Sequence, residues 1–223
     1  MGGAAAGEVA SRIAAETIAH HLSHVERRQM PTAASGRLLP HTAHLVDAVR
    51  QSNAAIYRQA RRNAQQAEMG TTVVSAFIDR SIAGVAHVGD SRAYLWYDGR
   101  LVRLTADHSL AGSEHVLIRA LGRQPDVDVA VSEVPLQAGD YLLLCSDGLT
   151  RMVSDDLLAD AIARVRDPQG ICDDLTEAAI GGGGTDNITV IVIEVLGSWR
   201  QRVSMRWRRQ MGGAHDVAVH RHA

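Results

Sequence analysis

The chain has 223 residues, which is enough for one ordinary domain but short for two, and its formal net charge is −2. Hydrophobic residues make up 46% and charged residues 22% of the chain, which excludes the disordered and fibrous classes. The near-neutral charge argues against a protein that coats nucleic acid, so we expect no nucleic-acid partner. All 23 Lys and Arg positions are arginine, which excludes chemistry that depends on a catalytic lysine.

The cysteine content indicates a reducing compartment. Cys145 and Cys172 are the only two cysteines, too few for a disulfide framework or a zinc cluster. No run of 18 apolar residues occurs, and the N-terminus lacks the pattern of a signal peptide, so we expect no membrane span. We therefore expect a cytoplasmic monomer.

The hydrophobic pattern changes twice along the chain. Apolar residues at helical spacing predict two helices before residue 70, over residues 4–28 and 42–66. From residue 71 β-branched runs indicate strands at 71–78, 82–88, 93–97, 101–104, 127–134 and 141–145. Helices at 154–166 and 173–180 and a strand at 187–195 follow. This order indicates a sandwich built on hairpins rather than a parallel doubly wound sheet.

Residues 197–223 are predicted to be a basic tail that follows one domain over residues 1–196. Large apolar residues recur there every four positions among arginines, at Trp199, Val203, Trp207 and Met211. A basic helix of this kind suits an anionic membrane surface or an acidic partner. The alternative is a frayed, solvated tail, which the shortness of the segment favours.

Three aspartates stand next to predicted strands and close to a glycine: Asp90, Asp147 and Asp186. Side chains at strand ends can converge at one edge of a sheet, and Mg²⁺ and Mn²⁺ prefer carboxylate oxygen ligands. Two such ions could activate water and neutralise a phosphoryl group. A turn residue that hydrogen-bonds its own backbone is nevertheless the commoner explanation of any one of these positions.

Four short blocks, in this order, resemble the metal-dependent protein phosphatases (the PPM or type-2C family) and look most like its compact bacterial members. They are Met69-Gly70-Thr71-Thr72, Gly89-Asp90-Ser91-Arg92, Ser146-Asp147-Gly148-Leu149 and Thr185-Asp186-Asn187. The resemblance implies an α+β fold, a four-layer αββα sandwich with two antiparallel β-sheets flanked by helix pairs. It also implies hydrolysis of phosphoserine and phosphothreonine by water that Mn²⁺ or Mg²⁺ activates, with phosphorylated proteins as substrates and a serine/threonine kinase as a candidate partner.

The same resemblance assigns roles to the three aspartates. Asp147 and Asp186 match ligands of the family's binuclear metal centre. Asp90 matches the position that, together with Asp147, holds a third and weaker metal ion in bacterial members. No residue of the substrate-binding surface is assigned by these blocks, and we expect no catalytic side chain beyond the metal-bound water.

The chain departs from the family pattern at its start. The family's first blocks supply an arginine that grips phosphate and an Asp-Gly pair that bridges both metals, whereas this chain starts Met1-Gly2-Gly3, which follows that pair in relatives. We therefore expect a domain that lacks the N-terminal strands and is impaired as an enzyme, through a truncated gene or a mis-assigned start. The alternative is an inactive pseudophosphatase that binds a phosphoprotein or a kinase. A flap shortened to residues 105–116 also puts the family's substrate preference in doubt.

The histidines and cysteines have simpler expected roles. His20 and His24 have the spacing of a metal pair, but no third ligand is evident and a solvated helix face is the expectation. His87 is expected to be packed in the core, whereas His108 and His115 are expected to be exposed loop residues. Both cysteine thiols are expected to be inert.

Overall fold

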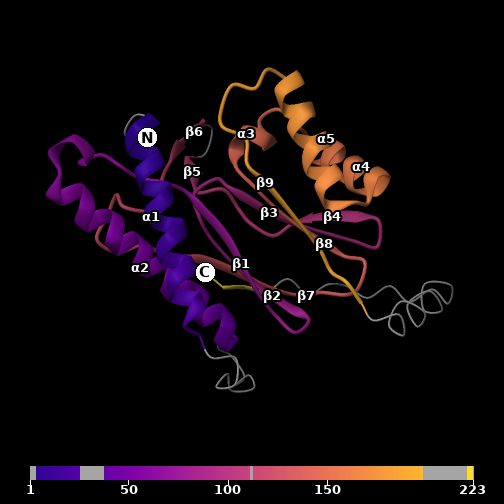
Figure 1. Cartoon of the computed structure of the whole chain (residues 1–223), viewed down its shortest axis with the longest axis horizontal. Helices are drawn as coiled ribbons and strands as arrows, with labels where there is room; N and C mark the ends of the chain where they lie inside the picture. The colour runs from indigo at the N-terminus through magenta and orange to yellow at the C-terminus, as the bar shows by residue number, and fades with distance from the viewer. Residues whose placement is uncertain (1–3, 26–37, 111–112, 198–219, 223) are drawn as a thin grey trace. The chain divides into compact units, whose positions relative to one another are not determined.

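The computed structural model describes residues 4–25, 38–110, 113–197 and 220–222, which belong to two compact units (Figure 1). The first unit comprises Met1–Ser91, Thr105–Glu133 and Arg221–Ala223, and the second comprises Arg92–Leu104 and Val134–His220. Each unit carries helices and an antiparallel sheet.

The first unit is a helix pair packed on a four-stranded sheet. Its helices are α1 (Ala4–Ser23), α2 (Pro40–Arg62) and the short 3₁₀ turn η2 (Ala64–Gln66). The sheet has the order β1-β2-β7-β10, formed by β1 (Val73–Asp79), β2 (Ile82–Val88), β7 (Ala130–Pro135) and β10 (His220–His222). A small separate hairpin pairs β5 (Ser109–Leu110) with β6 (Ser113–Leu117).

The two long helices of this unit lie side by side (Figure 1). On α1 the buried positions Ala6, Ala10 and Ala14 share one face, and their small side chains allow α2 to approach closely. On α2 the fully buried residues include Leu45, Val49 and Ile56. A Cβ atom at Gly84 of β2 would lie 2.3 Å from Thr42 Oγ1, so the start of α2 rests directly on the sheet.

The second unit is built around a fully buried central strand. Its sheet has the order β4-β3-β8-β9, formed by β3 (Arg92–Tyr97), β4 (Arg100–Arg103), β8 (Tyr141–Cys145) and β9 (Val190–Glu194). The helices of the unit are α3 (Asp147–Thr150), α4 (Asp155–Val165) and α5 (Pro168–Gly181). All five residues of β8 are buried, and this strand pairs with β3 on one side and β9 on the other.

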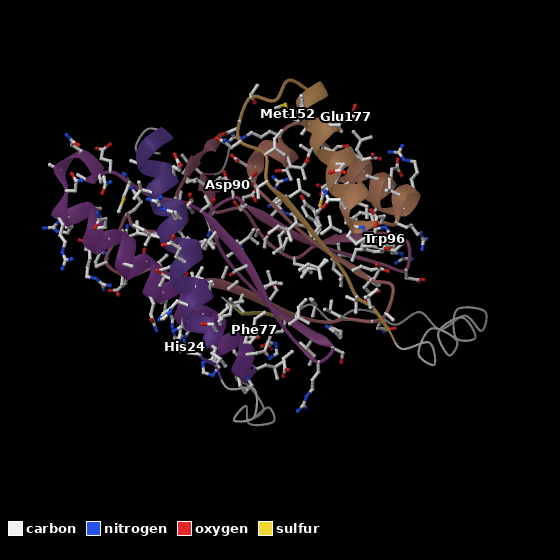
Figure 2. All side chains as sticks on the ribbon, viewed as in Figure 1. His24, Phe77, Asp90, Trp96, Met152 and Glu177 are labelled. Atoms are coloured by element: carbon white, nitrogen blue, oxygen red, sulfur yellow. The ribbon has the colours of Figure 1, made fainter. Side chains whose placement is uncertain are left out.

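Aromatic side chains join the sheet of the second unit to its helices. The Tyr94 hydroxyl donates to Asp155 Oδ1 at 2.9 Å, at the start of α4, and the Tyr141 hydroxyl donates to the Arg166 carbonyl at 2.7 Å, just after α4. The Trp96 ring, labelled in Figure 2, meets Tyr141 edge to face with the ring centroids 5.8 Å apart. These contacts fix α4 at both ends against the sheet.

The structure confirms the expected fold class, with two antiparallel sheets that each carry their own helices. The strands predicted at 93–97 and 101–104 form a hairpin that turns at Asp98-Gly99, with Tyr97 opposite Arg100 and positive φ angles of 47° and 76° at the two turn residues. Strands 82–88 and 141–145 have the predicted bounds.

The structure also corrects several predicted bounds. Helix α5 begins at Pro168 rather than near Asp173, because the Asp167 carboxylate accepts from the Gly170 N–H and Pro168 is a favourable first residue. Helix α2 ends at Arg62 rather than Gln66, since Asn63 caps η2 through the Gln65 N–H. The hairpin of β5 and β6 and the short helix α3 were not predicted.

No helix in the described part of the chain is long and apolar enough to cross a membrane. Most of the predicted basic tail, including Trp199, Val203, Trp207 and Met211, lies outside the described residues, so both the solvated tail and the alternative of a basic helix stay predictions.

Candidate metal centre

Asp147 stands where the central strand of the second unit ends. Strand β8 stops at Cys145, Ser146 is extended and occupies the N-cap position of α3 without a side-chain capping bond, and Asp147 is the first residue of that helix. The backbone thus turns sharply directly after a fully buried strand. The Asp147 side chain is therefore held at a rigid strand end rather than on a long loop.

Asp186 reaches the same place through a loop that is fastened to Ser146. The Ser146 N–H donates to the Thr189 carbonyl at 3.1 Å, and the Ser146 hydroxyl donates to the Asn187 carbonyl at 3.1 Å. The Thr189 N–H donates back to Ser146 Oγ at 3.0 Å. Ser146, the residue that precedes Asp147, therefore fastens the Asp186 loop through three hydrogen bonds.

Gly148 permits the close approach of these two segments. A Cβ atom at this position would lie 2.4 Å from the Asn187 carbonyl oxygen and 2.9 Å from its carbon. Because no larger residue fits without a backbone shift, glycine is required for the loop to rest on α3. The blocks Ser146-Asp147-Gly148 and Asp186-Asn187 are thus parts of one local structure.

The two carboxylates share one positive charge, the guanidinium of Arg151. Arg151 Nη2 lies 2.5 Å from Asp147 Oδ2, and Arg151 Nη1 lies 3.4 Å from Asp186 Oδ2. The side chains of Asp147 and Asp186 are 25% and 45% exposed. Both carboxylates therefore lie within reach of a single cation and remain open to water.

Sequence reasoning did not single out Arg151. Its distance of four residues from Asp147 is the ordinary signal for an ion pair on a helix and could have identified that contact. The contact with Asp186 depends on the docked loop and has no signal in the local sequence.

The carboxylate pair fits a hard divalent cation. Mg²⁺ is commonly bound through one or two carboxylates with water completing an octahedron, and Mn²⁺ accepts similar ligands. One oxygen atom of each carboxylate already faces the same cation, the Arg151 guanidinium. Among the described residues no group of three or more His, Cys, Asp or Glu side chains could hold a metal ion, so the pair supplies two ligands and not a complete cage.

Asp90 belongs to the first unit and lies in a closed environment. It follows β2, is labelled in Figure 2, and is only 9% exposed. The preceding Gly89 has a φ of 109°, and a Cβ atom there would lie 2.3 Å from Thr72 Cγ2. The Thr72 and Ser91 hydroxyls are hydrogen-bonded at 2.9 Å. Block 69–72 therefore shapes the turn that carries Asp90, whose assignment to a third metal site stays a prediction.

Two stacked histidines support this turn, and one of them was predicted wrongly. His87 is buried, as expected, and its ring stacks on His108 with the centroids 4.7 Å apart. His108 is buried rather than exposed, because its N–H donates to the Gly89 carbonyl at 2.9 Å and its Nδ1 accepts from the Gly89 N–H at 3.1 Å. Burial lowers the pKa of His108 to about 4, so the ring is neutral near pH 7.

The histidine pair of α1 and the two cysteines behave as the sequence predicted, whereas the side chain of His115 lies outside the described ones. His20 and His24 are exposed, and His24 Nδ1 bonds to the His20 carbonyl at 2.7 Å. Cys145 is buried, and burial raises its pKa to about 12. Burial also raises the pKa of Cys172. Neither thiol is activated as a nucleophile.

Comparisons with known proteins identify relatives of the chain. Residues 1–176 match the profile of the family described as Protein phosphatase 2C. The serine/threonine protein phosphatase PstP of Mycobacterium tuberculosis is 35% identical over 214 residues, which cover 88% of this chain and 39% of that protein. The serine/threonine phosphatase stp of Listeria welshimeri is 34% identical over 211 residues, which cover 87% of this chain and 81% of that protein.

Solved structures give the same result. A crystal structure of the M. tuberculosis phosphatase PstP/Ppp superposes with a TM-score of 0.77 at 33% identity, covering 88% of this chain and 86% of that one. The catalytic domain of PstP in complex with two manganese ions superposes with a TM-score of 0.74 at 34% identity, covering 88% of this chain and 85% of that one. The chain thus spans most of a solved catalytic domain but less than half the length of the full M. tuberculosis protein.

Proposed function

The chain belongs to the protein phosphatase 2C family, and from that premise we propose that it is a metal-dependent phosphatase acting on phosphoserine and phosphothreonine in proteins. The observation that carries the proposal is the convergence of Asp147 and Asp186 on one cation at the end of a buried strand. If the two aspartates bind a metal ion, their position beside one cation is explained. If each only stabilised its own turn, there would be no reason for them to lie together.

Asp147 and Asp186 would hold Mn²⁺ or Mg²⁺, with two ions in the centre as in the manganese complex of PstP. When bound, these ions lower the pKa of the attacking water and neutralise charge on the phosphoryl group. Ser146 and Gly148 keep the two carboxylates in register by fastening the Asp186 loop to α3. Attack of water on phosphorus breaks the bond to the serine or threonine oxygen and yields the free hydroxyl and inorganic phosphate.

A cysteine-based route is disfavoured by the state of the two thiols. A phosphocysteine mechanism requires a thiolate near neutral pH, and burial raises the pKa of Cys145 to about 12. The pKa of Cys172 is raised as well. Direct attack by water at the carboxylate pair is the chemistry that the remaining groups support.

The proposal also covers a third metal site, the substrates, the cellular location and a partner. Asp90 would contribute to a third, weaker metal site, phosphorylated proteins would be the substrates, and the protein would act in the cytoplasm beside a serine/threonine kinase. The hypothesis of an inactive binding module gains no support from the relatives, which carry phosphatase names.

The test is hydrolysis of p-nitrophenyl phosphate and of a phosphothreonine peptide with and without Mn²⁺. We expect activity that requires Mn²⁺ and falls at least about 100-fold in Asp147→Asn, in line with the loss of a group that stabilises the transition state. Asp174→Asn is the matched control, because Asp174 pairs with the exposed Arg164 on the helices of the same unit. A folded chain without Mn²⁺-dependent activity would contradict the proposal.

A further inference from the structure

Arg151 occupies the oxygen atoms that a metal ion at the carboxylate pair would use. We propose that Arg151 is a built-in competitor of the metal ion: its guanidinium neutralises Asp147 and Asp186 when no ion is bound and must move aside when one binds. This inference rests on the proposed function, because it concerns the same metal site.

The backbone holds Arg151 at this position independently of its side chain. The Arg151 N–H donates to the Asp147 carbonyl at 2.9 Å, so one helical hydrogen bond links the backbones of these two residues. The next residue, Met152, is labelled in Figure 2, and a Cβ atom at Gly182 would lie 3.2 Å from Met152 Cβ. The end of α3 therefore packs against the end of α5. The guanidinium can leave the carboxylates by side-chain rotation without disturbing this packing.

The hydrogen bonds of Asp186 show which contact is replaceable. Asp186 Oδ1 accepts from the Asn187 N–H at 2.8 Å, and Asp186 Oδ2 faces Arg151 Nη1 at 3.4 Å. The first contact is a local backbone bond that orients the carboxylate. The second is long and comes from a flexible side chain. A metal ion that takes Oδ2 therefore displaces Arg151 and leaves the backbone bond intact.

The net charge of the cluster also favours displacement of Arg151 by the metal ion. Two carboxylates carry −2, and with the guanidinium the cluster carries −1. A divalent ion would bring the cluster to +1 with Arg151 in place, but to 0 without it. Because the Arg151 side chain is only 33% exposed, water does not fully screen this repulsion. Arg151 therefore lowers the affinity for the metal ion while it stabilises the metal-free chain.

Arg151 is thus expected to weaken metal binding but to stabilise the metal-free chain. These opposite effects distinguish a competitor from a residue that only supports the fold. Removing a residue that only supports the fold destabilises the chain with and without metal. Removing an internal competitor destabilises only the metal-free chain and tightens metal binding.

The experiment measures Mn²⁺ affinity by calorimetry on the metal-stripped chain, together with thermal unfolding in a chelator. Arg151→Gln is expected to bind Mn²⁺ about tenfold more tightly, equivalent to about 1.4 kcal/mol, and to melt at a lower temperature in the chelator. Arg151→Lys keeps the charge and is expected to have an affinity close to that of the unmodified chain. Arg164→Gln, which removes the exposed ion pair with Asp174, is the matched control and should leave the Mn²⁺ affinity unchanged.

The outcomes distinguish the two proposals. If Asp147→Asn abolishes Mn²⁺ binding but Arg151→Gln binds no more tightly than the unmodified chain, the competitor role is wrong and the metal site stands. If Asp147→Asn binds Mn²⁺ as well as the unmodified chain, the ion lies elsewhere and both proposals fail. Should Arg151→Gln not fold, Arg151→Ala and Arg151→Met serve as further charge-free variants, and equal or weaker binding by a folded one overturns the competitor role.

Discussion

Each unit has an aspartate shortly after a strand, Asp90 after β2 and Asp147 after β8, but the two have different surroundings. In the first unit Asp90 is almost fully buried, in a turn braced by the Thr72 and Ser91 hydroxyls and the neutral His108 ring. In the second unit Asp147 and Asp186 are partly exposed and share a guanidinium. Different segments pack against the two strand ends. The segments around Asp90 close its turn, whereas those around Asp147 and Asp186 leave both carboxylates facing a cation. An aspartate next to a strand end and close to a glycine thus indicates where a carboxylate lies but not what it faces.

The largest effect is expected at the closed turn of the first unit. In Gly89→Ala the new Cβ atom would lie 2.3 Å from Thr72 Cγ2 at a φ of 109°, so steric overlap and backbone strain add. We expect the free energy of unfolding to fall by about 3 kcal/mol, measured by denaturant titration. Gly99→Ala is the control, because its φ is 76° but no atom lies within 4 Å of the added Cβ. Equal losses in both variants would show that packing against Thr72 contributes nothing.

The corresponding change in the second unit should act on metal binding more than on the fold. In Gly148→Ala the Cβ atom would lie 2.4 Å from the Asn187 carbonyl oxygen and would push the Asp186 loop away from Asp147. We expect a loss of about 2 kcal/mol in stability and a loss of at least about tenfold in Mn²⁺ affinity. Gly181→Ala, with no atom within 4 Å of the added Cβ, should leave both quantities nearly unchanged. Unchanged Mn²⁺ affinity in Gly148→Ala would break the link between loop docking and the carboxylate pair.

A pH dependence should arise from the first unit. The pKa of His108 falls from 6.5 to about 4 on folding, so the unfolded chain binds more protons between these values. The stability contributed by the neutral ring is present above pH 6.5 and is lost as the pH falls to about 4. We expect a loss of about 2 kcal/mol over this range in chemical unfolding.

His108→Asn is the variant that isolates this effect. Its amide oxygen can accept from the Gly89 N–H but does not titrate, so the dependence of stability on pH should become flatter between pH 4 and 6.5. An equally steep dependence in the variant would assign the effect to other groups.

The smallest effect is expected at Ser146. In Ser146→Ala the hydroxyl contacts with Asn187 and Thr189 are lost, whereas the backbone bond to Thr189 remains. We expect a loss of about 1 kcal/mol in stability, measured by thermal unfolding, and a small decrease in Mn²⁺ affinity. Ser154→Ala, which removes the N-cap of α4, is a matched control that should lower stability by a similar amount without changing the affinity. An affinity change in the control equal to that in Ser146→Ala would contradict a specific role for the serine.

The sequence predicted those parts of the molecule in which local pattern and burial agree. Strand β8 is an uninterrupted apolar run and is buried throughout, and the Asp98-Gly99 turn carries the residues that its φ angles favour. The helix predicted over residues 154–166 is α4, which begins just after Ser154, and the Ser154 hydroxyl caps it by accepting from the Leu157 N–H.

The sequence could not predict features that depend on tertiary contacts. His108 is buried because its backbone N–H and its ring both hydrogen-bond to Gly89, nineteen positions earlier, and no local sequence pattern signals this contact. Asp186 meets Arg151 because the loop docks through Ser146 and against Gly148, and these contacts join residues about forty positions apart. The ordered motif blocks predicted Asp147 and Asp186 as site residues, but the contact of both with Arg151 was found only in the structure.

The most direct test of the account is anomalous diffraction at the manganese edge from crystals of the chain grown with Mn²⁺. We expect a manganese peak within coordination distance of the Asp147 and Asp186 carboxylates, with the Arg151 guanidinium moved away from both. A manganese peak elsewhere, or an empty carboxylate pair still bridged by Arg151 at saturating Mn²⁺, would contradict it.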